Sequence, residues 1–233
     1  MTPALVIAHR GASAQEVENS LAAFRAAAAL GADAVELDVH ATADGALIVH
    51  HDEMIAAVHR IPHLSGRRVR ELRLPNGEPI PTLGEALEAV GPGLQVFVEA
   101  KTLPQRFDER LFDALAHGPN PAGYAVHSFD HRIVRRLGLE QPALRRGVLS
   151  ASYPVRPLAV LEDAGATILW QERSLVDRAL VDTLRGAALQ LIVWTVDDPA
   201  EMGRLLELGV DAICTNRPEL GRRAVDARRA GAA

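Results

Sequence analysis

One junction occurs three times along the chain, and it constrains the fold more than any other feature of the sequence. At residues 30–35, 164–168 and 208–213, a helical segment ends at Gly, a short turn follows, and an apolar β-type run begins. Glycine suits this position because it readily adopts the left-handed conformation in which many helices end. A repeated helix-to-strand junction of this kind favours an alternating (βα) array over an all-β sandwich.

Short apolar runs typical of buried parallel strands alternate with the helical segments. They lie at residues 5–8, 34–39, 46–50, 95–99, 125–127, 147–149, 167–170 and 191–196, with a short further run at 212–215. About eight strands in a chain of 233 residues matches the usual size of a (β/α)8 barrel. A doubly wound open sheet is the structural alternative, but the Gly-rich phosphate turn that should begin it is missing. We therefore predict an α/β fold, a (β/α)8 TIM-like barrel, formed by residues 1–233 as a single domain.

Composition narrows the classes of partner. Apolar residues make up 48% of the chain and charged residues 24%, as in ordinary soluble domains. The formal net charge of −5 gives no overall basic field, so we expect no nucleic-acid partner. Neither a signal-peptide pattern nor an apolar run of membrane-spanning length is found. We therefore expect a cytoplasmic protein without stable membrane association, and the single cysteine, Cys214, fits a reducing compartment.

One connection is too short to contain a crossover helix. It lies between the second and third apolar runs and includes Asp44-Gly45, a typical two-residue hairpin turn. With these two residues as the turn, Asp38 faces His51, and Glu36 lies on the same side of the hairpin. The hairpin therefore predicts that these two acids and one histidine gather on one face.

The end of the third run offers two neighbouring histidines. His50 and His51 point to opposite faces if the strand alternation continues, and the hairpin register selects His51. After Asp52 the periodicity fails. We predict that residues 53–81 form a short insertion over one end of the barrel.

Acidic residues interrupt two of the apolar strands. Glu36 and Asp38 share one strand face, where burial is unfavourable unless a cation neutralises them. A divalent ion with oxygen ligands would do so, and an ion pair with Arg or Lys is the alternative. Glu99 would add a third carboxylate, and Lys101 on the same face would contact a phosphate, unless these two residues simply pair with each other.

His9 and Arg10 follow the first strand, at the end where barrel enzymes place their catalytic groups. A capping histidine and a solvated arginine are the alternative explanation. Together with His51, Lys101 and the acids, they would form a metal site flanked by two imidazoles and two cations. Phosphodiester hydrolysis needs these parts, because the phosphate charge must be neutralised and protons must move to and from oxygen.

Further motifs occur in order along nearly the whole chain. They are His9-Arg10-Gly11, Glu18-Asn19-Ser20-Leu21, Gly31-Ala32-Asp33, Glu36-Leu37-Asp38, Asp44-Gly45, His51-Asp52, Pro81-Thr82-Leu83, Glu99-Ala100-Lys101, Ser128-Phe129-Asp130, Trp194-Thr195-Val196, Gly209-Val210-Asp211 and Thr215-Asn216-Arg217-Pro218. In this order they resemble the motifs of the glycerophosphodiester phosphodiesterase family.

The resemblance implies a barrel that binds one divalent metal ion, Mg2+ or Ca2+, and acts on a small-molecule glycerophosphodiester. The products would be glycerol 3-phosphate and an alcohol. By the same resemblance, the residues would divide into catalytic His9 and His51, metal-binding Glu36, Asp38 and Glu99, and substrate-binding Arg10, Lys101, Glu18 and Trp194. Core packing is an alternative explanation for Trp194. Asn19, next to Glu18, would lie near the site or serve only as a helix cap.

Other functions predict different features. A lysophospholipase D-like or phospholipase C-like enzyme should have an exposed apolar rim, for which Ile55, Ile61 and Leu64 are the candidates. A non-catalytic phosphate-ester binding barrel should lack a histidine or an acid of the set, and a sugar-phosphate isomerase would not need three carboxylates. The insertion also lacks the Thr/Gly-rich stretch usual in the family. The sequence therefore does not identify the alcohol that the reaction would release.

Overall fold

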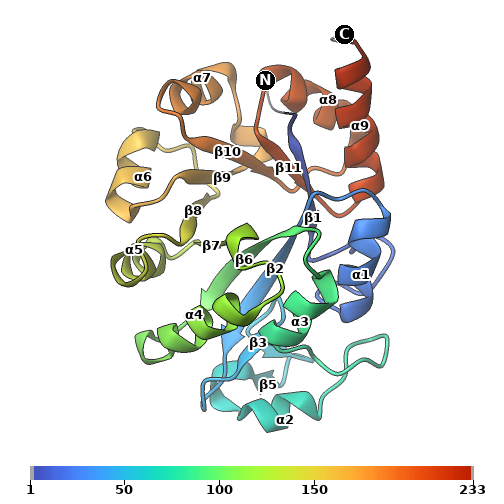
Figure 1. Cartoon of the computed structure of the whole chain (residues 1–233), viewed down its shortest axis with the longest axis vertical. Coiled ribbons are helices and arrows are strands. Elements are labelled where there is room, and N and C mark those ends of the chain that lie inside the picture. The colour runs from blue at the N-terminus through green and yellow to red at the C-terminus, as the bar shows by residue number, and fades with distance from the viewer. Residues whose placement is uncertain (1–2, 232–233) are drawn as a thin grey trace.

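The computed structural model describes residues 3–231, and its central element is a closed barrel of parallel strands surrounded by helices (Figure 1). Within this range the barrel strands are β1 (Leu5–His9), β2 (Ala34–Ala41), β6 (Gln95–Thr102), β7 (Tyr124–Ser128), β8 (Arg145–Ser150), β9 (Ile168–Glu172), β10 (Gln190–Trp194) and β11 (Ala212–Thr215). The barrel closes because β1 pairs with β2 on one side and with β11 on the other. The predicted (β/α)8 fold is confirmed.

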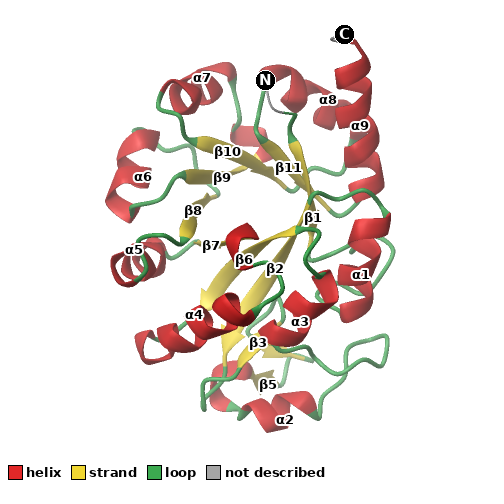
Figure 2. Cartoon of the chain, viewed as in Figure 1, coloured by secondary structure: helices red, strands yellow, loops and turns green. Residues whose placement is uncertain are grey.

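Helices cover the outside of the barrel (Figure 2). They are α1 (Leu21–Ala29), α3 (Leu83–Val90), α4 (Asp108–His117), α5 (His131–Glu140), α6 (Pro157–Ala164), α7 (Arg178–Gly186), α8 (Pro199–Leu208) and α9 (Pro218–Gly231). The glycines of the three repeated junctions, Gly31, Gly165 and Gly209, all have positive φ angles, of 82°, 63° and 87°. The local prediction is therefore confirmed, because each helix turns into its strand through a left-handed residue.

The set of barrel strands differs from the sequence prediction in one member. The run at residues 46–50 gives β3 (Leu47–Val49), which pairs antiparallel with β2 and lies outside the parallel barrel. The short run at 212–215, predicted only as an addition, is the eighth barrel strand. The predicted number of barrel strands was right because β11 takes the place that had been assigned to the run at residues 46–50.

The predicted hairpin register is wrong by one residue. Val39 pairs with Val49, so the turn has three residues instead of two, with Gly45 at a φ of 81°. The backbone of Asp38 therefore accepts a hydrogen bond from His50, at 3.1 Å, and not from His51. Three-residue hairpin loops with a left-handed Gly are a common alternative to the Asp-Gly two-residue turn.

The segment predicted as an insertion lies beside β3, at the bottom of Figure 1. It contains β4 (Met54–Ile55), β5 (His59–Arg60), a 3-10 turn (Ile61–His63) and α2 (Gly66–Arg70). Its own apolar cluster buries Ile55 and Ile61, and Leu64 packs against that cluster. These residues therefore do not supply the exposed apolar rim expected of a lysolipid hydrolase.

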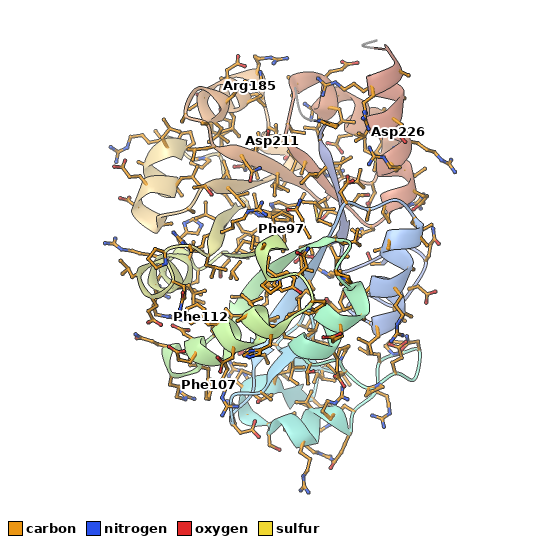
Figure 3. The ribbon with its side chains drawn as sticks, viewed as in Figure 1. Phe97, Phe107, Phe112, Arg185, Asp211 and Asp226 are labelled. Atoms are coloured by element: carbon orange, nitrogen blue, oxygen red, sulfur yellow. The ribbon has the colours of Figure 1, made fainter. Side chains whose placement is uncertain are left out.

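Side chains along each barrel strand alternate between two separate apolar regions. Inward positions that precede the C-terminal ends of the strands form one cluster, which includes Ile7, Ala34, Phe97 and Trp170. Figure 3 labels Phe97 near the middle of the barrel. Outward positions such as Val35 pack against the helices in other clusters. The barrel axis is thus filled with side chains, and only the C-terminal ends of the strands are left for a site.

No helix among the described residues combines the length and the apolar composition needed to cross a membrane. The predicted single domain of residues 1–233 also includes residues 1–2 and 232–233, which lie outside the described range.

A buried ion pair joins two neighbouring helices and gives a test of the fold. Asp108 on α4 is 1% exposed and accepts two hydrogen bonds from Arg136 on α5, at 2.6 and 2.9 Å. We expect Asp108→Ala to lower the free energy of unfolding by an amount near the lower end of roughly 3–5 kcal/mol, because it leaves the Arg136 charge without a partner. The partial exposure of the Arg136 side chain, 23%, limits the loss.

Urea denaturation measures this free energy, and Asp113→Ala on the exposed face of α4 is the matched control. The control should change stability by about 0.5 kcal/mol or less. Equal effects of the two variants would contradict a structural role for the ion pair.

Candidate active site

Inward side chains change from apolar to polar towards the C-terminal ends of the strands. His9 lies two positions after Ile7, Glu36 two after Ala34, and Glu99 two after Phe97. The resulting pocket is lined by His9, Arg10, Glu36, His51, Glu99, Lys101, His127, Phe129, Leu149, Trp170, Trp194, Thr195 and Cys214. The structure therefore brings together all the predicted site residues except Asp38 and Glu18, which do not line the pocket themselves.

Asp38 lies just behind the pocket and is contacted by three donors. Its carboxylate is 3.1 Å from Arg10 Nε and 3.2 Å from Lys101 Nζ, and it accepts a hydrogen bond of 2.8 Å from Asn19. Burial disfavours the charged form, but Lys101, Arg10 and Asn19 outweigh it and lower the pKa of Asp38. The ion-pair alternative is thus present, and Asp38 holds both cations at the pocket edge.

Asn19 and Glu18 act through these same groups. The N-cap of α1 is Ser20, whose hydroxyl accepts from Ala23, so Asn19 is not the cap. Asn19 instead has a φ of 56°, is 1% exposed, and orients Asp38. Glu18 is exposed and accepts a hydrogen bond of 2.8 Å from Arg10 Nη1. Both residues therefore position charged side chains that reach the pocket or its edge.

Glu99 pairs with Lys101 at 2.8 Å, as the alternative for this motif predicted. Burial, followed by the neighbouring charge of Asp38, raises the pKa of Glu99 to about 7. The Lys101 ammonium therefore lies between two carboxylates, those of Glu99 and Asp38, and neutralises them only in part.

Glu36 is the acid with the least compensation. It is 3% exposed, and its carboxylate accepts one weak hydrogen bond among the described residues, from the Arg10 backbone at 3.2 Å. Burial, then the charges of Asp38 and Glu99, raise the pKa of Glu36 well above its usual range. The carboxyl is therefore poorly stabilised as an anion by the protein alone.

The charges of the site do not balance when all three acids are ionised. Glu36, Asp38 and Glu99 would carry three negative charges when ionised, against the two positive charges of Arg10 and Lys101. A divalent cation near Glu36 would supply the missing positive charge, and carboxylate oxygens are suitable ligands for it. The residues present therefore fit a metal ion at this end of the barrel.

The orientation of His9 is fixed by a chain of hydrogen bonds. Its Nδ1 lies 2.7 Å from Asn216 Oδ1, and the Asn216 amide nitrogen donates to Asp197 at 2.6 Å. Asn216 therefore presents its carbonyl oxygen as the acceptor, and His9 donates from Nδ1. Burial, then the Arg10 charge, lower the pKa of His9, so its Nε2 faces the pocket without a proton near neutral pH.

His51 lies at the edge of the pocket, after β3 has ended. Its Nδ1 is 2.9 Å from Asp52 Oδ1, and its backbone carbonyl is 3.1 Å from Nε2 of the buried His40. His50 does not line the pocket and instead contacts the Asp52 backbone carbonyl. His51 is the pocket residue although the register that selected it is wrong, because both histidines follow the last paired residue, Val49.

Six of the pocket residues were not predicted as site residues, and His127 and Phe129 are two of them. His127 on β7 is 1% exposed and aligned with Glu99 on β6. Phe129 is 47% exposed and forms an edge-on pair with Trp194, with ring centroids 5.5 Å apart. The signal for His127 was available, because it lies two positions after the inward Ala125 at the end of a predicted strand.

Comparisons with known proteins agree on one family. A profile of the glycerophosphoryl diester phosphodiesterase family matches residues 9–220. A glycerophosphodiester phosphodiesterase of Caldanaerobacter subterraneus subsp. tengcongensis is 33% identical over 230 residues, covering 92% of this chain and 95% of the relative.

Solved structures are similar over the same length. An Oleispira antarctica phosphodiesterase in complex with the product sn-glycerol-3-phosphate matches with a TM-score of 0.88 and 25% identity, covering 96% of this chain and 97% of the other. A glycerophosphodiester phosphodiesterase from Parabacteroides distasonis matches with a TM-score of 0.88 and 26% identity, covering 97% and 98%.

The hydrogen bond from His9 to Asn216 predicts an unusual tautomer. We expect the His9 ring to be neutral near neutral pH, with its proton on Nδ1, because Asn216 offers only an acceptor. Nitrogen-15 NMR of the imidazole distinguishes the two tautomers. In Asn216→Ala the Nδ1–H form should lose its preference, whereas His131, which hydrogen-bonds through Nε2 to the Leu149 carbonyl, should be unchanged. A proton on His9 Nε2 in the unmodified protein would contradict the assignment.

Proposed function

The chain belongs to the glycerophosphoryl diester phosphodiesterase family, and on that basis we propose that it hydrolyses glycerophosphodiesters to sn-glycerol 3-phosphate and an alcohol, using one divalent metal ion and two histidines. The structural neighbour from Oleispira antarctica, a phosphodiesterase bound to the product sn-glycerol-3-phosphate, supports this substrate class. We also propose that the whole chain acts as one domain, with residues 53–81 as its insertion.

The observation that carries the proposal is the charge imbalance in the pocket. Three buried carboxylates lie beside two cations, and three imidazoles line the pocket, among them His9 and His51. A purely structural ion-pair network would balance its charges, because an uncompensated buried carboxylate is unfavourable. The imbalance therefore supports a site that gains its missing positive charge from a bound cation.

In this proposal Glu36, Asp38 and Glu99 are the metal-binding carboxylates. Oxygen ligands alone would favour Mg2+ or Ca2+. When bound, the ion would neutralise charge on the phosphate oxygens.

Arg10 and Lys101 are proposed to bind the phosphate group. Asp38 lies within 3.2 Å of both side chains, so each is positioned before substrate arrives. Fixed cations of this kind stabilise the charge that builds up on the phosphate oxygens as the reaction proceeds. Glu18 would assist by holding Arg10, and Trp194 would border the rest of the substrate.

The two histidines are proposed to divide the proton transfers. His9 Nε2, which carries no proton, would take one from the attacking hydroxyl group as its oxygen bonds to phosphorus. His51 would donate a proton to the alcohol oxygen as its bond to phosphorus breaks, and Asp52 orients the ring for this step. These roles apply both to attack by water and to initial attack by a substrate hydroxyl.

Product analysis tests the reaction and its metal requirement together. We expect purified protein with a divalent ion to release glycerol 3-phosphate from glycerophosphocholine or glycerophosphoethanolamine, and to lose this activity after chelation. Chromatography of the products gives the measurement, with a lysolipid as the alternative substrate. Turnover of the lysolipid alone, or of no diester at all, would contradict the proposed function.

The catalytic histidines can be tested against a neighbour that lies outside the pocket. His9→Ala and His51→Ala should each lower kcat by about 10^2–10^4-fold, the usual contribution of an acid–base group. His50→Ala is the matched control and should keep nearly full activity, because His50 does not line the pocket. Circular dichroism would show that the fold is retained. Near-full activity of either pocket variant would remove that residue from the mechanism.

A further inference from the structure

His127 lies in the same row of the barrel as two of the site's acids. Strand pairing places it beside Glu99, and Glu99 beside Asp38. Its Nε2 is 3.9 Å from Glu36 Oε1. One ligand atom each of Glu36, Glu99 and His127 lies within 4.8 Å of the other two, which is close enough for all three to bind one ion.

No hydrogen bond among the described residues compensates the burial of this histidine. His127 is 1% exposed, and its buried Nδ1 has no hydrogen-bond partner within residues 3–231. A buried imidazole with an unpaired nitrogen is less favourable than an apolar residue of similar size.

The ring of His127 is held in a fixed orientation. It stacks on Trp170, with ring centroids 4.2 Å apart and planes 11° apart. Gly147, the strand partner of His127 on β8, leaves space for Trp170, because a Cβ atom there would lie 2.9 Å from the Trp170 ring. Such packing places a ligand nitrogen before an ion binds.

We propose that His127 is a nitrogen ligand of the metal ion, beside the carboxylates of Glu36 and Glu99. The inference rests on the proposed metal-dependent function and names a further ligand of that site. Imidazole favours later first-row ions such as Co2+ or Zn2+ over Mg2+ or Ca2+, which prefer oxygen ligands alone. The site should therefore prefer an ion of the first group, contrary to the ions expected from the three acids.

Manganese itself provides the first probe. The full-length protein is stripped with chelator and loaded with Mn2+, and pulsed EPR then detects any nitrogen nucleus bound to the ion. We expect a coupling to nitrogen-14 that changes to a nitrogen-15 pattern when all histidines are isotopically labelled. This measurement needs no substitution, so it does not depend on whether a variant folds.

Variants then identify the histidine. His127→Gln should abolish the nitrogen coupling and weaken Co2+ binding, measured by calorimetry, by at least about tenfold, a loss seen even for outer-shell partners of metal ligands. Its Mg2+ affinity should change much less, because the carboxylates remain. His9→Gln, also near Glu36, and His131→Gln, outside the pocket, should both keep the coupling.

The outcomes separate this inference from the proposed function. Mn2+ binding without nitrogen coupling, coupling that survives in His127→Gln, or coupling lost in His9→Gln would each overturn the role of His127 alone. Failure of the unmodified protein to bind Mn2+, Co2+ or Mg2+ would overturn the metal-dependent function, and the ligand with it. Glu36→Gln separates the two further, since it should weaken binding of all three ions.

Discussion

The site depends on one geometric constraint, namely that every second side chain of a closed parallel barrel must point at the axis. Before the C-terminal ends of the strands, these inward positions are apolar and fill the interior of the barrel. Two residues further along, the inward side chains of neighbouring strands lie close together. His9, Glu36, Glu99 and His127 therefore converge from four strands. The same alternation that builds the core therefore concentrates polar groups at one end.

Gathering several acidic side chains in a buried site would be unfavourable unless neighbouring cations compensated their charge. Asp38 forms ion pairs with Arg10 and Lys101 and accepts a hydrogen bond from Asn19, so it holds the two cations in place at the pocket wall. Glu36 receives no such support and carries a pKa well above the usual range of a carboxyl. The protein therefore compensates the charge of Asp38 far better than that of Glu36, and a poorly compensated buried acid is typical of functional sites.

Features that depend on a few adjacent residues were predicted well from the sequence. Features that depend on how distant strands pair were predicted less well. The Gly-containing junctions depend on a few adjacent residues, and they are confirmed. The hairpin register was wrong because a Gly at the third loop position competes with the Asp-Gly turn, and sequence spacing alone does not separate the two. His127 was missed because one histidine in an apolar strand resembles a core residue until the strands beside it are known.

The hydrogen bonds that orient His9 join the two ends of the chain. His9 ends the first barrel strand, whereas Asn216 follows the last one, β11, and Asp197 follows β10. The acids come from β2 and β6, so they can gather before the C-terminal strand has docked. An incomplete barrel, such as a nascent or truncated chain, would hold its carboxylates but lack the partners that orient His9. The orientation of His9 is therefore a property only of the completed ring.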